Sequence, residues 1–272
     1  MDLIRRLSPD SLGVIEFANE KDLLIADKSA RYPLLGAKLT NSWNVQFQSE
    51  FHMTNDSYLF RDEFKKGLWP LFEGKMIHQF VHNFEKPRYW LSEKEARKAI
   101  LGRTEDKDQK LDYQYYRLGF RKIARNTDER TMISAIIPPN FHAENFQSVR
   151  MFDENGKRTL PADTLIYLCA VWNSFVVDSF LRLRVTANVN FFYVYQLPIP
   201  RLTEKDAASG AIVKRAAQLI CTTPEFDDLA KEVGLKSHKS GSTVTAERAK
   251  LRAELDGLVA HLYGLTEEEF AY

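Results

Sequence analysis

The longest helical candidate in the chain is the segment Ala162 to Leu183, which reads ADTLIYLCAVWNSFVVDSFLRL. Its apolar residues fall on nearly all faces of a helix instead of forming one stripe. A helix of this kind has to be buried on every side, so we expect a central helix packed on a sheet. Polar residues such as Asn173 and Asp178 interrupt the apolar run, which therefore indicates a buried helix and not a membrane span.

Strand-like patterns precede this helix. Apolar residues occupy alternate positions, as on one face of a strand, at Val45, Phe47 and Phe51. The same alternation recurs at Tyr116, Leu118 and Phe120. A short apolar run from Met132 to Ile137 ends at two prolines. The polar connection RNTDER, residues 125–130, has the length and composition that join antiparallel strands, so we expect a hairpin there.

The segment after the helix predicts one more strand and then helices. Asn190 to Tyr195 is an aromatic, strand-like run, and the prolines at 198 and 200 end it because proline cannot continue a ladder. Thr223 and Pro224 can begin a helix that Gly234 ends.

The last forty residues continue the helical pattern. Residues 235–243, LKSHKSGST, predict a flexible polar linker. Apolar residues then recur at helical spacing from Leu251 to Leu262, and Gly264 ends that helix. Thr266 and Glu269 have the spacing of a capping box. The whole pattern predicts an α+β fold: a lead-in at 1–40, a β-rich mixed domain with a long buried helix at 41–201, and a C-terminal helical segment at 202–272.

The composition is that of an ordinary globular domain. The 272 residues are 44% hydrophobic and 28% charged, and they include 18 Phe, 11 Tyr and 4 Trp, far more aromatic surface than a disordered chain carries. Two cysteines in unrelated contexts fit a reducing compartment. The first ten residues lack the apolar core of a signal peptide. We therefore expect a cytoplasmic protein with no membrane partner.

The net charge hides an uneven distribution. The chain has 38 Lys and Arg against 37 Asp and Glu, a formal charge of +1. This total does not indicate a nucleic-acid partner. Residues 243–272 contain six acids and three bases, so the first 242 residues carry about +4. An acidic end therefore masks a mildly basic body.

Motifs for self-contained chemistry are absent from the sequence. No GxGxxG or GxxxxGK[ST] stretch occurs, which disfavours a bound nucleotide cofactor, and no serine has a nucleophile-elbow frame. Three triplets match the E-x-K half of a metal-dependent nuclease site, at Glu73-Gly74-Lys75, Glu63-Phe64-Lys65 and Glu105-Asp106-Lys107. In a chain with this many charges such triplets arise by chance, so a nuclease is the weakest of the open alternatives. His78 and His82 have helical spacing for zinc, but nothing completes a ligand set.

A basic hairpin is the strongest candidate for binding. Between residues 117 and 130 there are two acids and five bases, namely Arg117, Arg121, Lys122, Arg125 and Arg130. Asn126 and Thr127 lie at the predicted tip. Arg and Lys on such a hairpin can contact phosphates, and the alternative is a solvated hairpin with internal ion pairs.

Several strings resemble one protein family. They are FHMTNDS at 51–57 with PLFEGKMIHQF at 70–80, then FRKIARNTDERTMISAIIP at 120–138, then WNSF at 172–175 with NFF at 190–192 and QLPIP at 196–200, and last AELDGLVAHLYGL at 253–265. In this order they resemble the C-terminal target-recognition region of type IIG-like restriction–modification adenine-specific DNA methyltransferases, which have relatives in phage-defence systems. Thr186-Ala187 departs from the glycine that such proteins often have before the NFF string.

The resemblance implies a division of labour. The chain contains neither the family's catalytic Asn-Pro-Pro-Tyr/Phe motif nor its glycine-rich cofactor motif. It is therefore expected to be a DNA-recognition part, with no catalytic residue and no metal or cofactor of its own. The expected partners are double-stranded DNA and a methyltransferase domain, in the same parent chain or separate, that binds S-adenosylmethionine and methylates the flipped adenine at N6. Whether the chain itself has any enzymatic activity stays open.

The resemblance also divides the candidate residues. Positions shared by relatives that read different DNA sequences cannot encode the sequence, so Lys75, Arg121, Lys122, Arg125 and Arg130 are expected to contact phosphates or hold the scaffold. His78, Gln79, Asn126 and Asn188 are candidates for reading bases. Other base readers are expected within residues 86–110 or 141–157. The alternative from another class is a protein-interaction module of a defence complex that does not contact DNA.

Overall fold

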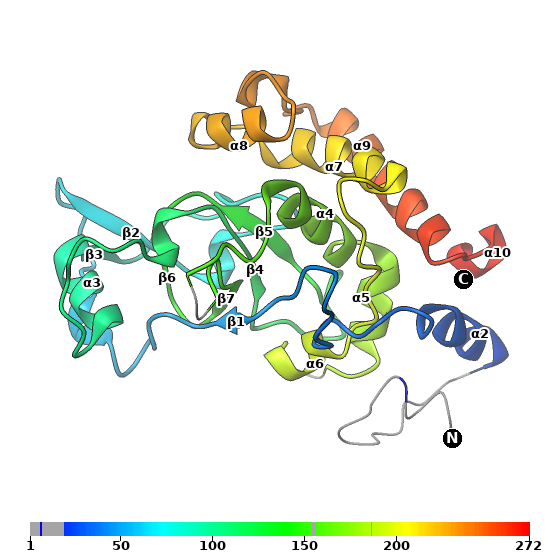
Figure 1. Ribbon diagram of the computed structural model, residues 1–272, viewed down its shortest axis with the longest axis horizontal. Coiled ribbons are helices and arrows are strands. Elements are labelled where there is room, and N and C mark those ends of the chain that lie inside the picture. Colours follow the sequence, from blue (N-terminus) through cyan, green and yellow to red (C-terminus); the bar gives the residue numbers. More distant parts are fainter. Residues whose placement is uncertain (1–5, 7–18, 154–155, 186) are drawn as a thin grey trace.

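A four-stranded antiparallel sheet lies at the centre of the protein, whose computed structural model describes Arg6 and residues 19–153, 156–185 and 187–272 (Figure 1). The strand order is β1 (Phe47–Gln48), β7 (Phe146–Val149), β4 (Arg117–Arg121) and β5 (Ser134–Ile137). The predicted hairpin is confirmed, because β4 pairs antiparallel with β5 and Leu118 lies opposite Ile136. The strand expected around Val45 to Phe51 is reduced to the two residues of β1.

Both faces of this sheet are covered. On β5, Ile136 belongs to the main hydrophobic core, whereas Ala135 and Ile137 belong to a smaller cluster on the opposite face. All four residues of β5 are therefore buried, as expected of a strand with no solvent face. Gly119 in β4 makes room for the ring of Phe146, which would lie 2.3 Å from an added Cβ.

The apolar segment at 162–183 forms two helices, so the expectation of a single long helix is wrong. Helix α4 (Ala162–Trp172) and helix α5 (Phe175–Arg182) are bent by 60° at the break. Ser174 caps α5 by accepting a hydrogen bond from Val177 N–H. The Asn173 amide bonds to both the N–H (3.0 Å) and the carbonyl (2.9 Å) of Ser134 on β5. The polar pair that interrupts the apolar run thus ends one helix and begins the next.

The burial expected of this segment is confirmed. Ten of the eleven residues of α4 are buried, and the helix packs against β4, β5 and α7. Within the described residues, no single helix is long and apolar enough to cross a membrane, and α4 with α5 reaches that length only as a bent pair.

A second, smaller sheet lies at one end of the molecule (Figure 1, left). Strand β2 (Leu68–Phe72) pairs antiparallel with β3 (Trp90–Ser92) and parallel with β6 (Phe141–His142). Helix α3 (Glu93–Leu101) follows β3, and the 3-10 turns η1 (Ser57–Leu59), η2 (Gly74–Met76) and η3 (Asp112–Gln114) connect this part. It has a core of its own, built from Phe51, Leu71, Leu91, Tyr113 and Phe141 among others.

The aromatic run at 190–195 is helical, so the strand expected there is wrong. Residues Phe191–Tyr195 form the short helix α6. Phe191 and Tyr195 both contact the ring of Phe47, with centroids 5.1 and 4.7 Å away, and Val194 is fully buried. Positions i, i+3 and i+4 face the same side of a helix, and this packing outweighs the β propensity of aromatic residues.

The C-terminal helices pack on the central helix. Helix α7 (Ala207–Ile220) contacts α4, and α9 (Thr245–Leu262) contacts α7 and α5 (Figure 1). The predicted helix after Thr223 appears as η4 (Pro224–Phe226) and α8 (Asp227–Glu232). Gly234 and Gly264 have φ angles of +81° and +71°, the left-handed conformation of a helix C-terminus. The capping box before α10 (Glu267–Ala271) is confirmed.

Residues 235–243 are packed, so the expectation of a flexible linker is wrong. They include the 3-10 turn η5 (His238–Ser240), and Asp227 accepts hydrogen bonds from the His238 N–H (2.8 Å) and ring Nδ1 (2.7 Å). An added Cβ on Gly241 would lie 2.0 Å from the Cys221 carbonyl oxygen, which shows how closely the two backbones approach.

The two ends of the described chain lie together. Helix α2 (Glu20–Ser29), capped by Asn19, lies near α10, and Lys28 pairs with Glu269 at 2.6 Å (Figure 1). The main hydrophobic core contains Ala26 from the lead-in, the α4 residues and Val259 from α9. All three regions expected from the sequence therefore contribute to one core.

We expect Asn173→Ala to lower the free energy of unfolding by about 2–4 kcal/mol, because it leaves the buried Ser134 N–H and carbonyl without their partner. Urea titration measures this change. Asn190→Ala is the matched control, since Asn190 is exposed and makes no side-chain capping bond. Equal stabilities of the two variants would contradict the role given to Asn173.

Candidate nucleic-acid interface

The basic hairpin uses most of its charge internally. Arg121 donates from Nε to the Ile77 carbonyl oxygen at 2.8 Å. Lys122 forms an ion pair with Glu144 at 3.3 Å. These contacts fix the hairpin to its neighbours.

The far end of the hairpin divides into a fixed and an exposed part. The guanidinium of Arg130 lies 3.4 Å from the ring centroid of Phe175 and 3.8 Å from Asp256, and its side chain is 10% exposed. Arg125 and Asn126 are exposed, and the Asn126 carbonyl accepts a hydrogen bond from Arg182. Arg130 is therefore a packing residue, while Arg125 and the side chain of Asn126 stay accessible to a ligand.

The other candidates differ in how exposed they are. Gln79 is 6% exposed, and its Nε2 donates to the Asn173 carbonyl at 2.9 Å, a position with no access to a DNA base in this structure. His78 is half-buried against Phe84, and burial lowers its pKa. Lys75 is exposed, and its ammonium group lies 3.9 Å from the Glu73 carboxylate. Asn188 is also exposed, and its backbone forms an antiparallel β-bridge with Ile123 of the hairpin. Lys75 and His78 lie beside Arg121, which donates to the Lys75 carbonyl at 3.4 Å and lies over the Phe84 ring that His78 also contacts, whereas Gln79 is buried away from them.

The structure gives no support to a metal site. Glu73 is buried and pairs with Arg88 at 2.9 Å and with Lys75, so cations and not carboxylates surround it. His82 packs against the ring of Phe226 instead of facing His78. Among residues 19–153, 156–185 and 187–272, no three His, Cys, Asp or Glu side chains are placed to hold a metal ion.

Arg117 belongs to a buried charge network. Its guanidinium is fully buried and contacts the Glu50 carboxylate and the Asn140 carbonyl. The same carboxylate accepts a hydrogen bond from the backbone N–H of His142 at 2.9 Å. Burial alone would raise the pKa of Glu50, but Arg117 and His142 lower it. This network ties the segment after β1 to β4 and β6, and it removes Arg117 from any contact with a ligand.

The imidazole of His142 is neutral in this network. Its Nδ1 lies 3.0 Å from the Ala143 carbonyl, which only accepts, so Nδ1 carries the proton and Nε2 accepts from the Ser148 hydroxyl at 2.8 Å. Burial lowers the pKa of His142 to about 4.

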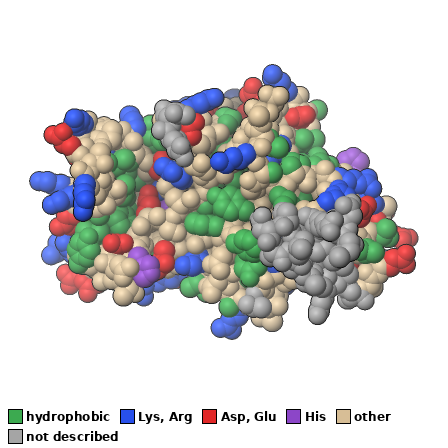
Figure 2. All heavy atoms as spheres, turned by 60° about the horizontal axis from the view of Figure 1, so that its bottom comes forward, with side chains coloured by type: hydrophobic (Ala, Val, Ile, Leu, Met, Phe, Trp, Pro, Cys, Tyr) green, Lys and Arg blue, Asp and Glu red, His purple; other side chains and the backbone are tan. Residues whose placement is uncertain are grey.

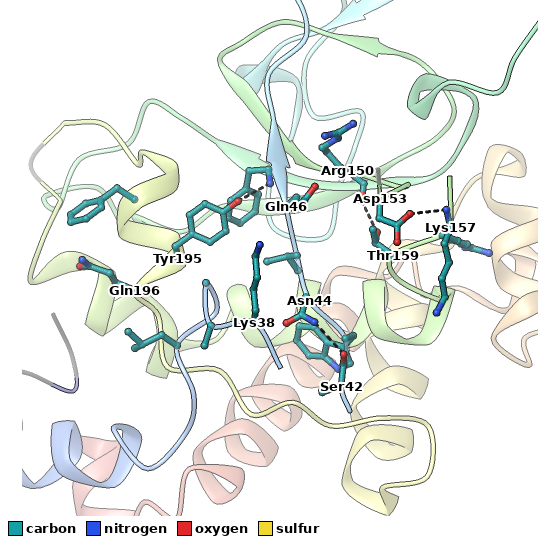
Figure 3. Close-up of a pocket in the computed structure, with 18 residues that line it drawn as sticks. Lys38, Ser42, Asn44, Gln46, Arg150, Asp153, Lys157, Thr159, Tyr195 and Gln196 are labelled. Atoms are coloured by element: carbon teal, nitrogen blue, oxygen red, sulfur yellow. Dashed lines mark hydrogen bonds between the residues drawn. The ribbon is translucent and has the colours of Figure 1, made fainter. Parts of the chain in front are cut away.

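An open groove lies beside β1. We call it the β1 groove; its volume is about 1020 Å³ (Figure 3). It is lined by residues from three distant segments: Leu34, Gly36, Ala37, Lys38, Ser42, Trp43, Asn44, Val45, Gln46 and Phe47; Arg150, Asp153, Lys157, Arg158 and Thr159; and Phe192, Tyr195 and Gln196. The groove therefore exists only in the folded chain.

Strand register places the central side chains of the groove. Phe47 pairs with Val149, so the preceding Gln46 lies opposite Arg150, and the Arg150 N–H donates to the Gln46 carbonyl at 2.8 Å. The Phe47 N–H donates to the Tyr195 hydroxyl at 3.0 Å, which fixes α6 to β1. Figure 3 shows Gln46 between Tyr195 and Arg150, with Lys38 reaching toward it from the opposite side.

The groove is positively charged. Lys38, Arg150, Lys157 and Arg158 line it, against the single acid Asp153. Arg158 pairs with Glu232, but the side chains of Lys38, Arg150 and Lys157 make no ion pair or hydrogen bond within the part of the chain that the structure describes. Figure 2, which shows the side of the molecule that carries β1 and α6, has Lys and Arg side chains distributed around a patch of hydrophobic ones. Unpaired cations beside apolar groups suit a ligand that has both phosphates and flat rings.

Sequence reasoning missed most of this groove. Arg150, Asp153 and Lys157 fall within residues 141–157, where further readers were expected, but Lys38 and Gln46 were not singled out. The aromatic residues at 190–192, which include Phe192, were considered for stacking on a base, but a strand in the core was the preferred prediction. The only sequence signal was the mild positive charge of the body. Comparison with protein-family models and with curated proteins gives no match for this chain.

We expect the stability of the protein to fall by about 2 kcal/mol between pH 7.5 and pH 5 through His142 alone. The unfolded histidine binds a proton near pH 6.5 and the folded one only near 4, so the unfolded state gains protons first as the pH falls. Urea unfolding of wild type and His142→Gln at both pH values measures this.

The variant should lose that share of the pH dependence, whatever its stability at pH 7.5. His261→Gln, which changes an exposed histidine on α9, is the control and should keep the wild-type slope. Identical pH dependence in wild type and His142→Gln would show that His142 is not held neutral by burial.

Proposed function

We propose that this chain is the sequence-specific DNA-recognition part of a restriction–modification adenine-N6 DNA methyltransferase. In this role it holds the duplex while a separate catalytic domain, which binds S-adenosylmethionine, methylates the flipped base. The observation that carries the proposal is the β1 groove, where Lys38, Arg150 and Lys157 are unpaired within the described residues. The strings that resemble the target-recognition region support it independently.

The location of the free cations changes the expected contact surface. Each of four hairpin cations already has a partner elsewhere in the protein, namely Arg117, Arg121, Lys122 and Arg130. A cation that already has such a partner gains less from a phosphate. In the β1 groove, Arg158 pairs with Glu232, but Lys38, Arg150 and Lys157 have no ion-pair or hydrogen-bond partner for their side chains within the described residues. The groove is therefore the main phosphate-contacting surface of the proposed function, and exposed Arg125 is an accessory one.

We expect the purified chain to bind a labelled DNA duplex weakly and with steep salt dependence. The triple variant Lys38→Gln/Arg150→Gln/Lys157→Gln should bind about 10- to 100-fold more weakly at low salt and reduce the slope of log K against log salt by about 2–3, one for each lost phosphate contact. Fluorescence anisotropy over a salt series measures both quantities.

The matched control is Lys205→Gln/Lys214→Gln/Lys236→Gln. It removes the same charge from exposed positions in the C-terminal helical region and should keep the wild-type slope. If wild type binds no DNA at low salt, the proposed function is wrong. If both triple variants weaken binding equally, the groove is not the contact surface.

We further expect that the chain alone neither methylates nor cleaves DNA. The reason is the missing Asn-Pro-Pro-Tyr/Phe and glycine-rich motifs of the sequence. Purified protein with S-adenosylmethionine, Mg²⁺ and DNA is assayed for transfer of a labelled methyl group and for cleavage products. Either activity, if it copurifies with the wild-type chain and not with an unrelated protein prepared in the same way, contradicts the division of labour.

A second candidate function is a protein-interaction module, which one observation favours. A largely apolar groove of about 600 Å³ lies between α2, α5 and α10, and the exposed rings of Phe175, Phe270 and Tyr272 line it. Exposed apolar surface of this kind is typical of protein contacts. The DNA titration separates the two functions, because a pure interaction module binds no duplex at any salt concentration.

A further inference from the structure

We infer that the β1 groove binds an unpaired segment of a DNA strand, with one base lying on Phe192 and its edge facing Gln46. This inference rests on the proposed function and names the form of DNA that the groove takes. Three properties of the groove carry it: its concave shape, the exposed aromatic ring of Phe192, and an unpaired amide beside unpaired cations.

Shape argues against paired bases in the groove. In an intact duplex the base edges lie about 8.5 Å deep in a major groove about 12 Å wide, so only a protruding helix or ribbon reaches them. Gln46 lies on the opposite kind of surface, in the lining of a hollow and only partly exposed. A base can meet it there only after leaving the stack, and a volume of about 1020 Å³ has room for more than one nucleotide.

Phe192 provides a stacking surface. Its side chain is 46% exposed on α6, whereas its neighbours Phe191 and Tyr195 are partly buried against Phe47. Grooves that bind single strands combine cations along the backbone with aromatic rings on which bases stack. Lys38, Arg150 and Phe192 line the same groove and supply both elements.

Gln46 provides hydrogen bonds for the base edge. Its backbone is fixed by the bond from Arg150 N–H, but its side-chain amide makes no hydrogen bond within the described residues. In contrast, the amide of Asn44 is fully engaged with the backbone of Leu39, at 2.8 and 2.9 Å. A glutamine amide offers a donor and an acceptor together, which is the pattern that an unpaired base edge needs.

Two polar atoms of the groove lining lack a partner as well. Ser42 Oγ and Gln196 Nε2 are buried and make no hydrogen bond in the described part of the chain, and Gln196 is only 4% exposed. Buried polar groups without partners are uncommon in folded proteins because each costs free energy. Both atoms lie behind the groove surface, so a nucleotide strand would reach them only if the lining shifts.

The test compares a labelled 20-base-pair duplex with the same duplex that contains a three-nucleotide mismatched bubble. Wild type should bind the bubble about tenfold more tightly than the perfect duplex. Phe192→Ala should lose this preference and keep its affinity for the perfect duplex within about twofold, because Phe192 contributes stacking and no charge. Gln46→Ala should reduce the preference by a smaller factor. Fluorescence anisotropy at low salt measures the affinity of each of the three proteins for each of the two DNAs.

The control variant is Phe64→Ala, which removes another exposed aromatic ring, one that packs against Trp90 and does not line the groove, and it should behave as wild type. Equal affinity of wild type for bubble and perfect duplex overturns this inference and leaves the proposed function standing. Absence of binding to either DNA overturns both. Retention of the preference in Phe192→Ala removes Phe192 from the site even if the groove binds DNA.

Discussion

The requirement to bury α4 on every side organises the molecule. A helix with apolar residues all round cannot face water, and here β4 and β5 cover one side while α7 covers another. The segment from Leu165 to Trp172 therefore joins the sheet and the C-terminal helices into one hydrophobic core. Asn173 completes this arrangement, because its amide bonds to Ser134 and directs the chain into α5. The position of α6, and with it one wall of the β1 groove, follows from the path of the chain after this turn.

Charge in this protein divides into two kinds of environment. Arg117, Arg130 and Arg121 are partly or fully removed from water, and each has a carboxylate, carbonyl or aromatic ring as partner. A buried cation without such a partner would be strongly destabilising, so these residues cannot be released to a ligand without a cost in stability. Lys38, Arg150 and Lys157 of the β1 groove are at least partly exposed and make no side-chain ion pair or hydrogen bond within the described residues, so this cost does not apply to them. Local basicity in the sequence therefore identified the residues that hold the scaffold, and the available charge lies elsewhere.

The elements that could be predicted are those with local signals. The β4–β5 hairpin, the burial of residues 162–183 and the glycine-ended helices of the C-terminal region all follow from periodicity, turn residues or caps within a short window. The break at Asn173 and the helix α6 depend on contacts with β5 and Phe47, which are distant in sequence, so propensity alone gave the wrong answer. The groove is the extreme case. Lys38, Gln46, Arg150 and Phe192 share no motif or spacing. Strand pairing between β1 and β7 brings Gln46 and Arg150 together, and all four residues line one groove only in the folded chain.

Acidic residues of the C-terminal region pair with particular basic residues in the folded chain. Glu269 pairs with Lys28, Asp256 contacts Arg130, and Glu254 pairs with Arg215 at 2.6 Å, so acids of the tail neutralise particular bases of the body. The overall charge of +1 thus includes internal pairs of this kind, and such pairs exert little field at a distance because salt screens them. What a charged ligand meets is the local surplus of cations in the β1 groove, which the net charge does not reveal. A nearly neutral chain can in this way present a basic surface of limited size, which favours selective contact over strong non-specific attraction.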